Sequence, residues 1–303
     1  MKLKITHETR YSYDTPVQAL VQSLRLTPSV YEGQRVGDWQ ISVSGGQRGA
    51  AFRDGAGDWI EGWTVRGPVE VVTVTIDGLV ETRDTAGVLR GHREWVNPLV
   101  YLRDTPATRP DDALRALARS VEGEDALDLA HKLCAAVNQA IEYRPGVTEA
   151  ATSAAQALEL GQGVCQDHAH ALIACARVRN LPARYVSGYL HSREDGEPHD
   201  AAHAWAEIHV GSLGWVGFDA ANACCPDDRY VRLGSGLDAQ DAAPVRGMAF
   251  GQGVEALAVR VHVEEVPPGP GQAQSQAQSQ GQGESPSQDQ AQWQDQQSGQ
   301  RQQ

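Results

Sequence analysis

Three residues of the chain have side chains that could together form an activated cysteine nucleophile. Cys165 follows the glycine-rich segment Gly161-Gln162-Gly163-Val164, and His203 and Asp219 come later in the sequence. A free cysteine is only a few per cent thiolate at neutral pH, so it needs a helix N-terminus, a nearby imidazole or both to become a strong nucleophile. Thiol, imidazole and carboxylate in this order indicate a nucleophile, its base and a group that orients the base.

The residues after Cys165 predict a helix that begins at the cysteine. Ala169, Leu172, Ile173 and Ala176 recur at helical spacing and form one core-facing stripe, while the preceding glycines interrupt any earlier element. We therefore expect Cys165 in the first turn, where unpaired backbone N–H groups and the positive end of the helix dipole favour an anion. The same N–H groups could receive the oxyanion of a tetrahedral intermediate.

His203 begins a segment that predicts a half-buried strand. The even positions of residues 203–210 are apolar, so that His203 and Trp205 share the other face with Glu207. Glycines at 211 and 214 predict a turn, and a second strand is expected to end at Asp219, which completes an antiparallel hairpin. A three-residue loop would place Asp219 opposite Trp205 and diagonal to His203, with Cβ atoms about 7 Å apart, within reach of an Asp–His hydrogen bond.

The other four cysteines lack these surroundings. Cys134 and Cys175 lie within apolar helical patterns and are expected to be small buried side chains. Cys224 and Cys225 are adjacent, so a disulfide between them would be strained, and no Cys or His pair at zinc-finger spacing accompanies them. Only Cys165 is therefore predicted to be a nucleophile.

Four segments of the chain resemble the bacterial transglutaminase-like proteins. They are Gly163–His170, Pro182–Tyr189, His203–Glu207 and Gly214–Asp219. The resemblance covers about residues 1–265, because Leu3–Arg25 and Trp39–Val43 are similar to the small β domain that precedes the core in this family. It implies a papain-like core in which Cys165, His203 and Asp219 carry the catalytic triad. Departures at Asp58 and at Ala220-Ala221-Asn222 fall in predicted loops and concern loop shape more than chemistry.

The remaining patterns predict an α+β fold whose parts follow one another along the chain. Alternating apolar residues predict an N-terminal β domain over residues 1–105. A papain-like transglutaminase core is expected over residues 111–235, with helices at about 111–122 and 125–143 and the Cys165 helix packed on an antiparallel sheet. Residues 236–266 are predicted to include one last strand, near 257–263, that returns to the first sheet.

Residues 267–303 have the composition of a disordered tail. They are rich in Gln, Ser and Gly and nearly free of aliphatic residues, so they cannot bury enough apolar surface to offset chain entropy. An alternative hypothesis makes these glutamines acyl donors for crosslinking at Cys165. A polar low-complexity tail without that role is the simpler interpretation.

The composition of the whole chain predicts a cytoplasmic enzyme. Its 303 residues are enough for two domains, and the net charge of -13 opposes binding to nucleic acid or to an anionic membrane. No apolar segment approaches the length of a membrane span, and the first residues alternate as a strand does rather than as a secretory signal. Five cysteines without a disulfide framework fit a reducing compartment.

The resemblance implies a cysteine enzyme that acts on a peptide or protein substrate and needs neither a cofactor nor a metal. In this hypothesis the Cys165 thiolate attacks an amide carbonyl, His203 protonates the leaving amine, and an acyl-enzyme forms. Water then completes the hydrolysis of a peptide or isopeptide bond, and acyl transfer to an amine is the alternative. Four further residues are predicted to contact the substrate or to support the nucleophile: Trp205, Tyr189, Asp167 and His168.

Two other classes of protein remain open from the sequence. A metal-dependent hydrolase would draw its ligands from Asp167, His168, His170, His199, Asp200 and His203. His199 and His203 have the spacing of a helical zinc pair, but Asp200 replaces the glutamate of the His-Glu-x-x-His motif and the following alternation predicts a strand. A catalytically silent binding module is the other class, because fold alone does not guarantee chemistry. For the four supporting residues, ordinary packing and helix capping are the structural alternatives.

Overall fold

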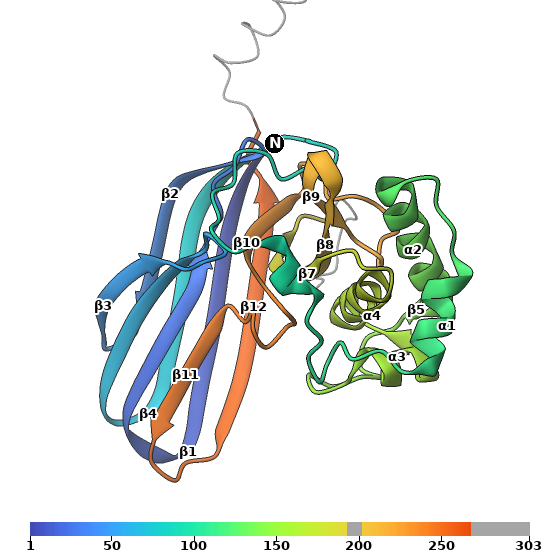
Figure 1. Cartoon of the computed structure of the whole chain (residues 1–303). Coiled ribbons are helices and arrows are strands. Elements are labelled where there is room, and N and C mark those ends of the chain that lie inside the picture. The colour runs from blue at the N-terminus through green and yellow to red at the C-terminus, as the bar shows by residue number, and fades with distance from the viewer. Residues whose placement is uncertain (193–201, 268–303) are drawn as a thin grey trace, which may run out of the picture. The chain divides into compact units, whose positions relative to one another are not determined.

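The N-terminal part of the chain folds as an antiparallel sheet. In the computed structural model, which describes residues 1–192 and 202–267, this sheet has six strands. They are β1 (Lys2–Thr27), β2 (Gln34–Val43), β3 (Gly46–Arg53), β4 (Trp59–Thr82), β11 (Val245–Phe250) and β12 (Glu255–Glu265). The long strands β1 and β4 pair along most of their length, β2 and β3 pair with β4, and β11 and β12 pair with β1 (Figure 1).

An irregularity in β1 changes which residues face the core. The odd-numbered residues from Leu3 to Tyr13 are buried, whereas the even-numbered residues from Leu20 to Leu26 are buried further along. The pairing with β4 shifts register between Ser12 and Val17 and again between Val17 and Ala19. Val17 is still buried, so the change of parity falls at the second shift. One strand thus contributes two successive apolar faces to the sheet.

The strand expected near residues 257–263 is β12, and it returns to the N-terminal sheet. It pairs with the first half of β1, from Leu3 opposite Glu265 to Tyr13 opposite Glu255. The tail predicted from residue 267 lies outside the described residues, apart from Pro267 itself. No helix within the described ranges has both the length and the apolar composition of a membrane span.

The second part of the chain combines helices with a smaller antiparallel sheet. The helices are η1 (Pro98–Leu102), α1 (Asp112–Ser120), α2 (Ala126–Ala140), α3 (Ala154–Leu160) and α4 (Cys165–Val178), with a two-stranded pair β5 (Glu142–Tyr143) and β6 (Gln162–Gly163). The sheet follows, with β7 (Ala183–Leu190), β8 (Ala202–Val210), the short turn η2 (Gly211–Leu213), β9 (Gly214–Phe218) and β10 (Tyr230–Gly236). Its strand order is β10-β7-β8-β9.

One predicted helix is shorter in the structure, and one helix was not predicted. The helix expected to run to Tyr143 ends at Ala140, because Tyr143 instead pairs with Gly163 in the β5–β6 ladder. The helix α3 has no counterpart among the predicted elements. It begins with a capping box in which the side chains of Ser153 and Gln156 bond to each other's backbone N–H.

The helix α4 is the centre of the second core, and it is buried on all sides rather than along one stripe. Every residue from Asp167 to Arg177 is buried. The helix contacts α1, α2 and α3 as well as β7 and β8, so that other elements surround it (Figure 1). The single core-facing stripe predicted from the sequence therefore covers only part of the buried surface of α4.

The strand β8 is likewise buried on both faces, which corrects the expectation of a half-buried strand. Ala204, Ala206 and Ile208 belong to the core around α4. On the other face Glu207 forms ion pairs with Arg184 and Arg232, both of which are buried. A polar face of a strand can be buried when its charges are paired in this way.

The two cores are joined by β10 and β7. Tyr189, Val231 and Leu233 from these strands pack into the apolar cluster of the N-terminal sheet. The Arg232 guanidinium also pairs with Asp58, which precedes β4, at 3.1 Å. The boundary predicted between residues 1–105 and residues 111–235 falls in the segment between β4 and α1 and stays a prediction, since Met1–Val266 form one compact unit.

Candidate active site

Cys165 is the first residue of α4 and is partly exposed. Val164 before it has an extended backbone, and its N–H donates to Asp167 Oδ2 at 2.8 Å. The Thr148 hydroxyl donates to the same oxygen at 2.7 Å. A Cβ at Gly163 would lie 2.7 Å from Asp167, so only glycine fits before this helix start. These contacts hold the first turn, and with it the thiol, in place.

His203 lies between the thiol and a carboxylate. Its Nε2 donates to Asp219 Oδ2 at 2.6 Å, and the side chain of Cys165 lies close enough to the ring to raise the pKa of His203. Because Nε2 is bonded to Asp219, Nδ1 is the nitrogen left for Cys165. Burial lowers the pKa of His203, but the hydrogen bonds and charges of Asp219 and Cys165 outweigh it and raise the pKa to about 10. The structure thus brings the three residues of the predicted triad together.

The Asp219 carboxylate is buried and receives hydrogen bonds at both oxygens. Oδ1 accepts from the backbone N–H groups of Ala221 and Asn222 at 3.0 and 3.2 Å. Oδ2 accepts from Asn222 Nδ2 at 2.7 Å and from the Tyr230 hydroxyl at 2.8 Å, in addition to His203. Burial raises the pKa of Asp219, but these donors and His203 hold it below its usual value. The group is therefore a stable carboxylate.

The hairpin that carries His203 and Asp219 has the register expected from parity. Residues 211–213 form the three-residue loop, and Ala206 pairs with Phe218 while Val210 pairs with Gly214. Continuing this register places Asp219 opposite Trp205 and diagonal to His203. The odd loop length is what puts both side chains on one face.

Trp205 packs against the imidazole. Its ring lies nearly parallel to that of His203, with centroids 6.4 Å apart, and edge-on to that of Tyr230 at 5.5 Å. The Trp205 side chain is buried, so its contact limits the movement of the His203 ring. Direct contact with a substrate stays a prediction.

Tyr189 does not reach the site. Gly188 pairs with His203, so strand alternation directs Tyr189 to the opposite face of β7. Its hydroxyl hydrogen-bonds His7 Nδ1 on β1 at 2.7 Å within the core of the N-terminal sheet. The structure thus favours the packing alternative for this residue.

Asp167 and His168 make local contacts around the start of α4. Asp167 caps the helix, as described above. The two ring nitrogens of His168 lie 2.9 and 2.8 Å from the backbone oxygens of Val164 and Ile141. Both residues thereby join the helix start to its surroundings, and neither is bonded to His203 or Asp219.

The described residues do not form the cluster of ligands that a metal-dependent hydrolase would need. Within residues 1–192 and 202–267, no three His, Cys, Asp or Glu side chains converge on a possible metal position. His170 Nε2 instead accepts the Ala239 N–H at 3.0 Å. His199 and Asp200 lie outside the described residues.

The other cysteines differ from Cys165 in their surroundings. All five cysteines are free thiols. Burial raises the pKa of Cys134 and of Cys175 to about 12, and burial raises the pKa of Cys225 to about 11. Burial also raises the pKa of Cys224. None of these four begins a helix.

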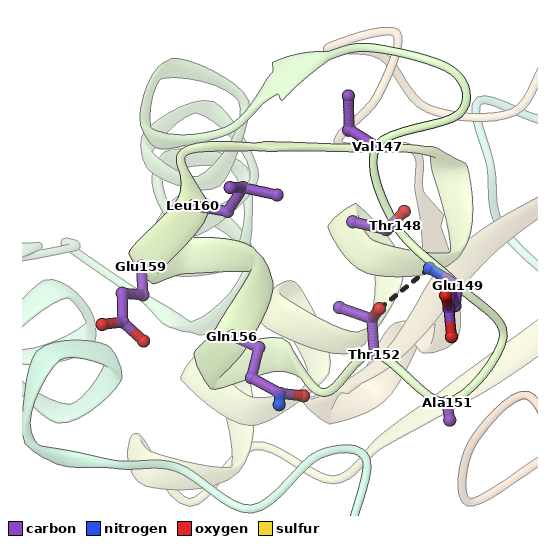
Figure 2. Close-up of a pocket in the computed structure, with 8 residues that line it drawn as sticks. All are labelled: Val147, Thr148, Glu149, Ala151, Thr152, Gln156, Glu159 and Leu160. Atoms are coloured by element: carbon purple, nitrogen blue, oxygen red, sulfur yellow. Dashed lines mark hydrogen bonds between the residues drawn. The ribbon is translucent and has the colours of Figure 1, made fainter.

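A hollow of about 530 Å³ lies between α3 and the loop that precedes it (Figure 2). It is lined by Val147, Thr148, Glu149, Ala151, Thr152, Gln156, Glu159 and Leu160. Its loop is tied to the first turn of α4, because Thr148 donates to Asp167 and Gln166 Nε2 donates to the Ala150 carbonyl at 3.1 Å.

Two family models match the chain. The Transglutaminase-like superfamily model matches residues 115–220, and the Bacterial transglutaminase-like N-terminal region model matches residues 3–81. The chain therefore belongs to the transglutaminase-like superfamily, with the N-terminal region of its bacterial members. Asn222 and Tyr230 lie outside the residues that the core model matches. Of the two, only Asn222 could be singled out in the sequence, as part of a departure from the turn that is usual in the family.

Relatives and a solved structure resemble the chain over most of its length. An uncharacterized protein of Mycobacterium leprae is 29% identical over 281 residues, which cover 86% of this chain and 98% of that protein. One of Mycobacterium tuberculosis is 28% identical over 294 residues, covering 88% and 93%. The crystal structure of a "putative cysteine protease" from Cytophaga hutchinsonii has a TM-score of 0.67 at 22% identity, covering 89% of this chain and 93% of that one. The predicted α+β fold is thereby confirmed.

Proposed function

We propose that the protein is a cysteine enzyme that hydrolyses a peptide or isopeptide bond through an acyl-enzyme on Cys165. The observation that carries this proposal is the placement of Cys165, at the N-terminus of α4, close to His203, whose imidazole hydrogen-bonds Asp219. Membership of the transglutaminase-like superfamily supports it, and so does the likeness to the Cytophaga protein.

The first half of the reaction forms the acyl-enzyme. His203 Nδ1 takes the proton of Cys165, and the resulting thiolate lies at the positive end of α4. The sulfur attacks the amide carbon, and backbone N–H groups of the first turn receive the oxyanion. His203 then returns its proton to the nitrogen of the leaving amine as the C–N bond breaks.

The second half releases the product. Water gives a proton to His203 and attacks the thioester carbon, the C–S bond breaks, and the carboxylic acid leaves. Asp219 keeps the proton of the neutral imidazole on Nε2 and compensates the charge of the imidazolium. An amine that replaced water at this step would make the reaction acyl transfer.

The substrate is proposed to be a peptide or protein. The net charge of -13 repels nucleic acid and anionic lipid, and the hollow between α3 and the loop before it offers both apolar side chains and the carboxylates of Glu149 and Glu159.

The proposal is tested with a peptide library incubated with the protein and a labelled primary amine. We expect free carboxyl products to exceed amine incorporation, and Cys165→Ala to lower turnover by roughly 10⁴-fold or more, since the nucleophile is lost. Cys175→Ala is the matched control and keeps full activity. Dominant amine incorporation would replace hydrolysis by acyl transfer. Turnover that survives Cys165→Ala would exclude the cysteine mechanism.

A further inference from the structure

One oxygen of Asp219 is shared by three side-chain donors. Oδ2 accepts from His203 Nε2 at 2.6 Å, from Asn222 Nδ2 at 2.7 Å and from the Tyr230 hydroxyl at 2.8 Å. Hydrogen bonds to a charged acceptor are stronger than those between neutral groups. The orientation of this carboxylate is therefore set by Asn222 and Tyr230 as well as by the imidazole.

Tyr230 is itself held firmly beside the imidazole. The residue is 3% exposed, and its ring packs edge-on against His203, with centroids 5.9 Å apart, and against Trp205 at 5.5 Å. Burial and the charge of Asp219 raise the pKa of Tyr230, so the hydroxyl keeps its proton and remains a donor. The ring contacts leave this donor little freedom to turn away from Asp219.

The strand that carries Tyr230 is anchored in the N-terminal sheet. Two residues further along β10, the Arg232 backbone N–H donates to Gln34 Oε1 at 2.8 Å, and its carbonyl accepts from the Ser29 N–H at 2.9 Å. The Arg232 guanidinium bonds Ser29 Oγ at 2.6 Å and pairs with Asp58 at 3.1 Å. The N-terminal sheet thus determines where β10, and with it Tyr230, lies relative to Asp219.

We propose that Tyr230 is a positioning residue for the candidate triad. Its hydroxyl holds Asp219 as an anion in the orientation that directs Nδ1 of His203 to Cys165, and the N-terminal sheet holds Tyr230 through β10. This inference rests on the proposed function, because it assumes that Cys165 and His203 form the reactive pair.

The consequence of losing this hydroxyl follows from charge. Without it the Asp219 anion is less well stabilised and takes up a proton at higher pH. The His203 imidazolium then lacks its counter-charge over a wider acidic range. The pair of Cys165 thiolate and imidazolium consequently forms only at higher pH.

The test is the pH profile of alkylation of the full chain by iodoacetamide, with each cysteine followed separately by mass spectrometry. In Tyr230→Phe, we expect the pH of half-maximal Cys165 reactivity to rise by about one unit, the size expected for one hydrogen bond to a charged group. Tyr189→Phe removes an equally buried hydroxyl that bonds His7 and is expected to leave the profile unchanged. Asn222→Ala shifts the profile in the same direction by less, since the backbone N–H at 222 still donates to Asp219.

The outcomes separate this inference from the proposed function. If Cys165 of the unaltered protein reacts no faster than Cys134, the proposed function and this inference both fail. If Cys165 is activated but Tyr230→Phe and Asn222→Ala both keep the original profile, only this inference is overturned. An equal shift in Tyr189→Phe would also overturn it, because the effect would then come from general loosening of the fold. Asn222→Ala decides the matter if Tyr230→Phe does not fold.

Discussion

At the scale of single residues, the ionic state of His203 and Asp219 decides what the candidate site can do. His203 has a raised pKa and Asp219 a lowered one, so the imidazolium–carboxylate pair persists across neutral pH. A positive imidazolium beside a cysteine favours the thiolate, so the same pair favours transfer of the Cys165 proton to His203. This pairing also makes the stability of the fold depend on pH.

His203 and Asp219 make the stability of the fold depend on pH in opposite directions. Because the folded pKa of His203 is raised from 6.5 to about 10, its contribution to stability is full below pH 6.5 and is lost as pH rises towards 10. Asp219, with a lowered pKa, contributes above its unfolded pKa of 3.8, and this is lost as pH falls through the folded value. We expect the Tm of the protein to fall between pH 7 and 10, and His203→Gln to show a flatter curve over that range. Equal slopes for the two proteins would contradict the assigned pKa.

Asp219→Asn tests the orienting role of the carboxylate. The amide has the size of the carboxylate but brings its own N–H donors to a position already surrounded by donors. We expect turnover to fall by roughly 10³- to 10⁴-fold with a small change in KM, since the imidazole loses its tautomer and counter-charge. Steady-state kinetics on the peptide found with the unaltered protein measures this, and a loss confined to KM would argue against it.

The residues of the candidate active site could be predicted from the sequence only where their order along the chain and the local hydrophobic pattern indicate them. Cys165, His203 and Asp219 stand at the ends of recognisable elements, and the structure brings them together. Tyr230 could not be found in this way, because its link to Asp219 is a tertiary contact between a strand and a loop. Tyr189 follows a core motif, but strand alternation turns it towards β1.

At the scale of elements, the length of one loop decides whether the site exists. The loop 211–213 between β8 and β9 has three residues, and this odd number places Asp219 on the face of His203. Parity can be worked out from the sequence, and so the hairpin register could be predicted. Burial on both faces of β8 could not, because the partners of Glu207 come from other strands.

Deleting Ser212 tests this dependence on loop length. A two-residue loop would turn the residues of β9 to the opposite face, or force a bulge, and Asp219 would no longer meet His203. We expect Cys165 to lose its enhanced alkylation while far-ultraviolet circular dichroism stays close to that of the unaltered protein. Replacing Ser212 with Ala is the control, because it keeps the loop length. Retained Cys165 reactivity in the deletion variant would show that parity does not govern the site.

At the scale of the whole described molecule, buried charges join the two cores. Asp58, which departs from the asparagine expected for the family, is fully buried and pairs with Arg232. Arg232 in turn pairs with Glu207, and Glu207 with Arg184. The sequence could show that Asp58 was unusual but not that it faced a buried guanidinium, since the two residues lie 174 positions apart.

Asp58→Ala is expected to destabilise the protein strongly. Removing one partner of a buried ion pair leaves the other charge uncompensated, at a cost of roughly 3–5 kcal/mol. Asp58→Asn is expected to cost less, because an amide oxygen can still accept from the Ser235 N–H that now donates at 2.7 Å. Urea unfolding measures both. An Asp58→Ala variant as stable as the unaltered protein would show that Glu207 and Ser29 satisfy Arg232 without Asp58.

The return of β12 to β1 has a consequence for the order in which the protein is made. Leu3 pairs with Glu265, so the first strand to leave the ribosome waits for one of the last strands before its edge is covered. The helices and smaller sheet of the second core are synthesised in between, and contacts so distant in sequence slow folding. A nascent chain stopped before residue 245 would therefore expose the full edge of β1 to other chains and be prone to aggregate.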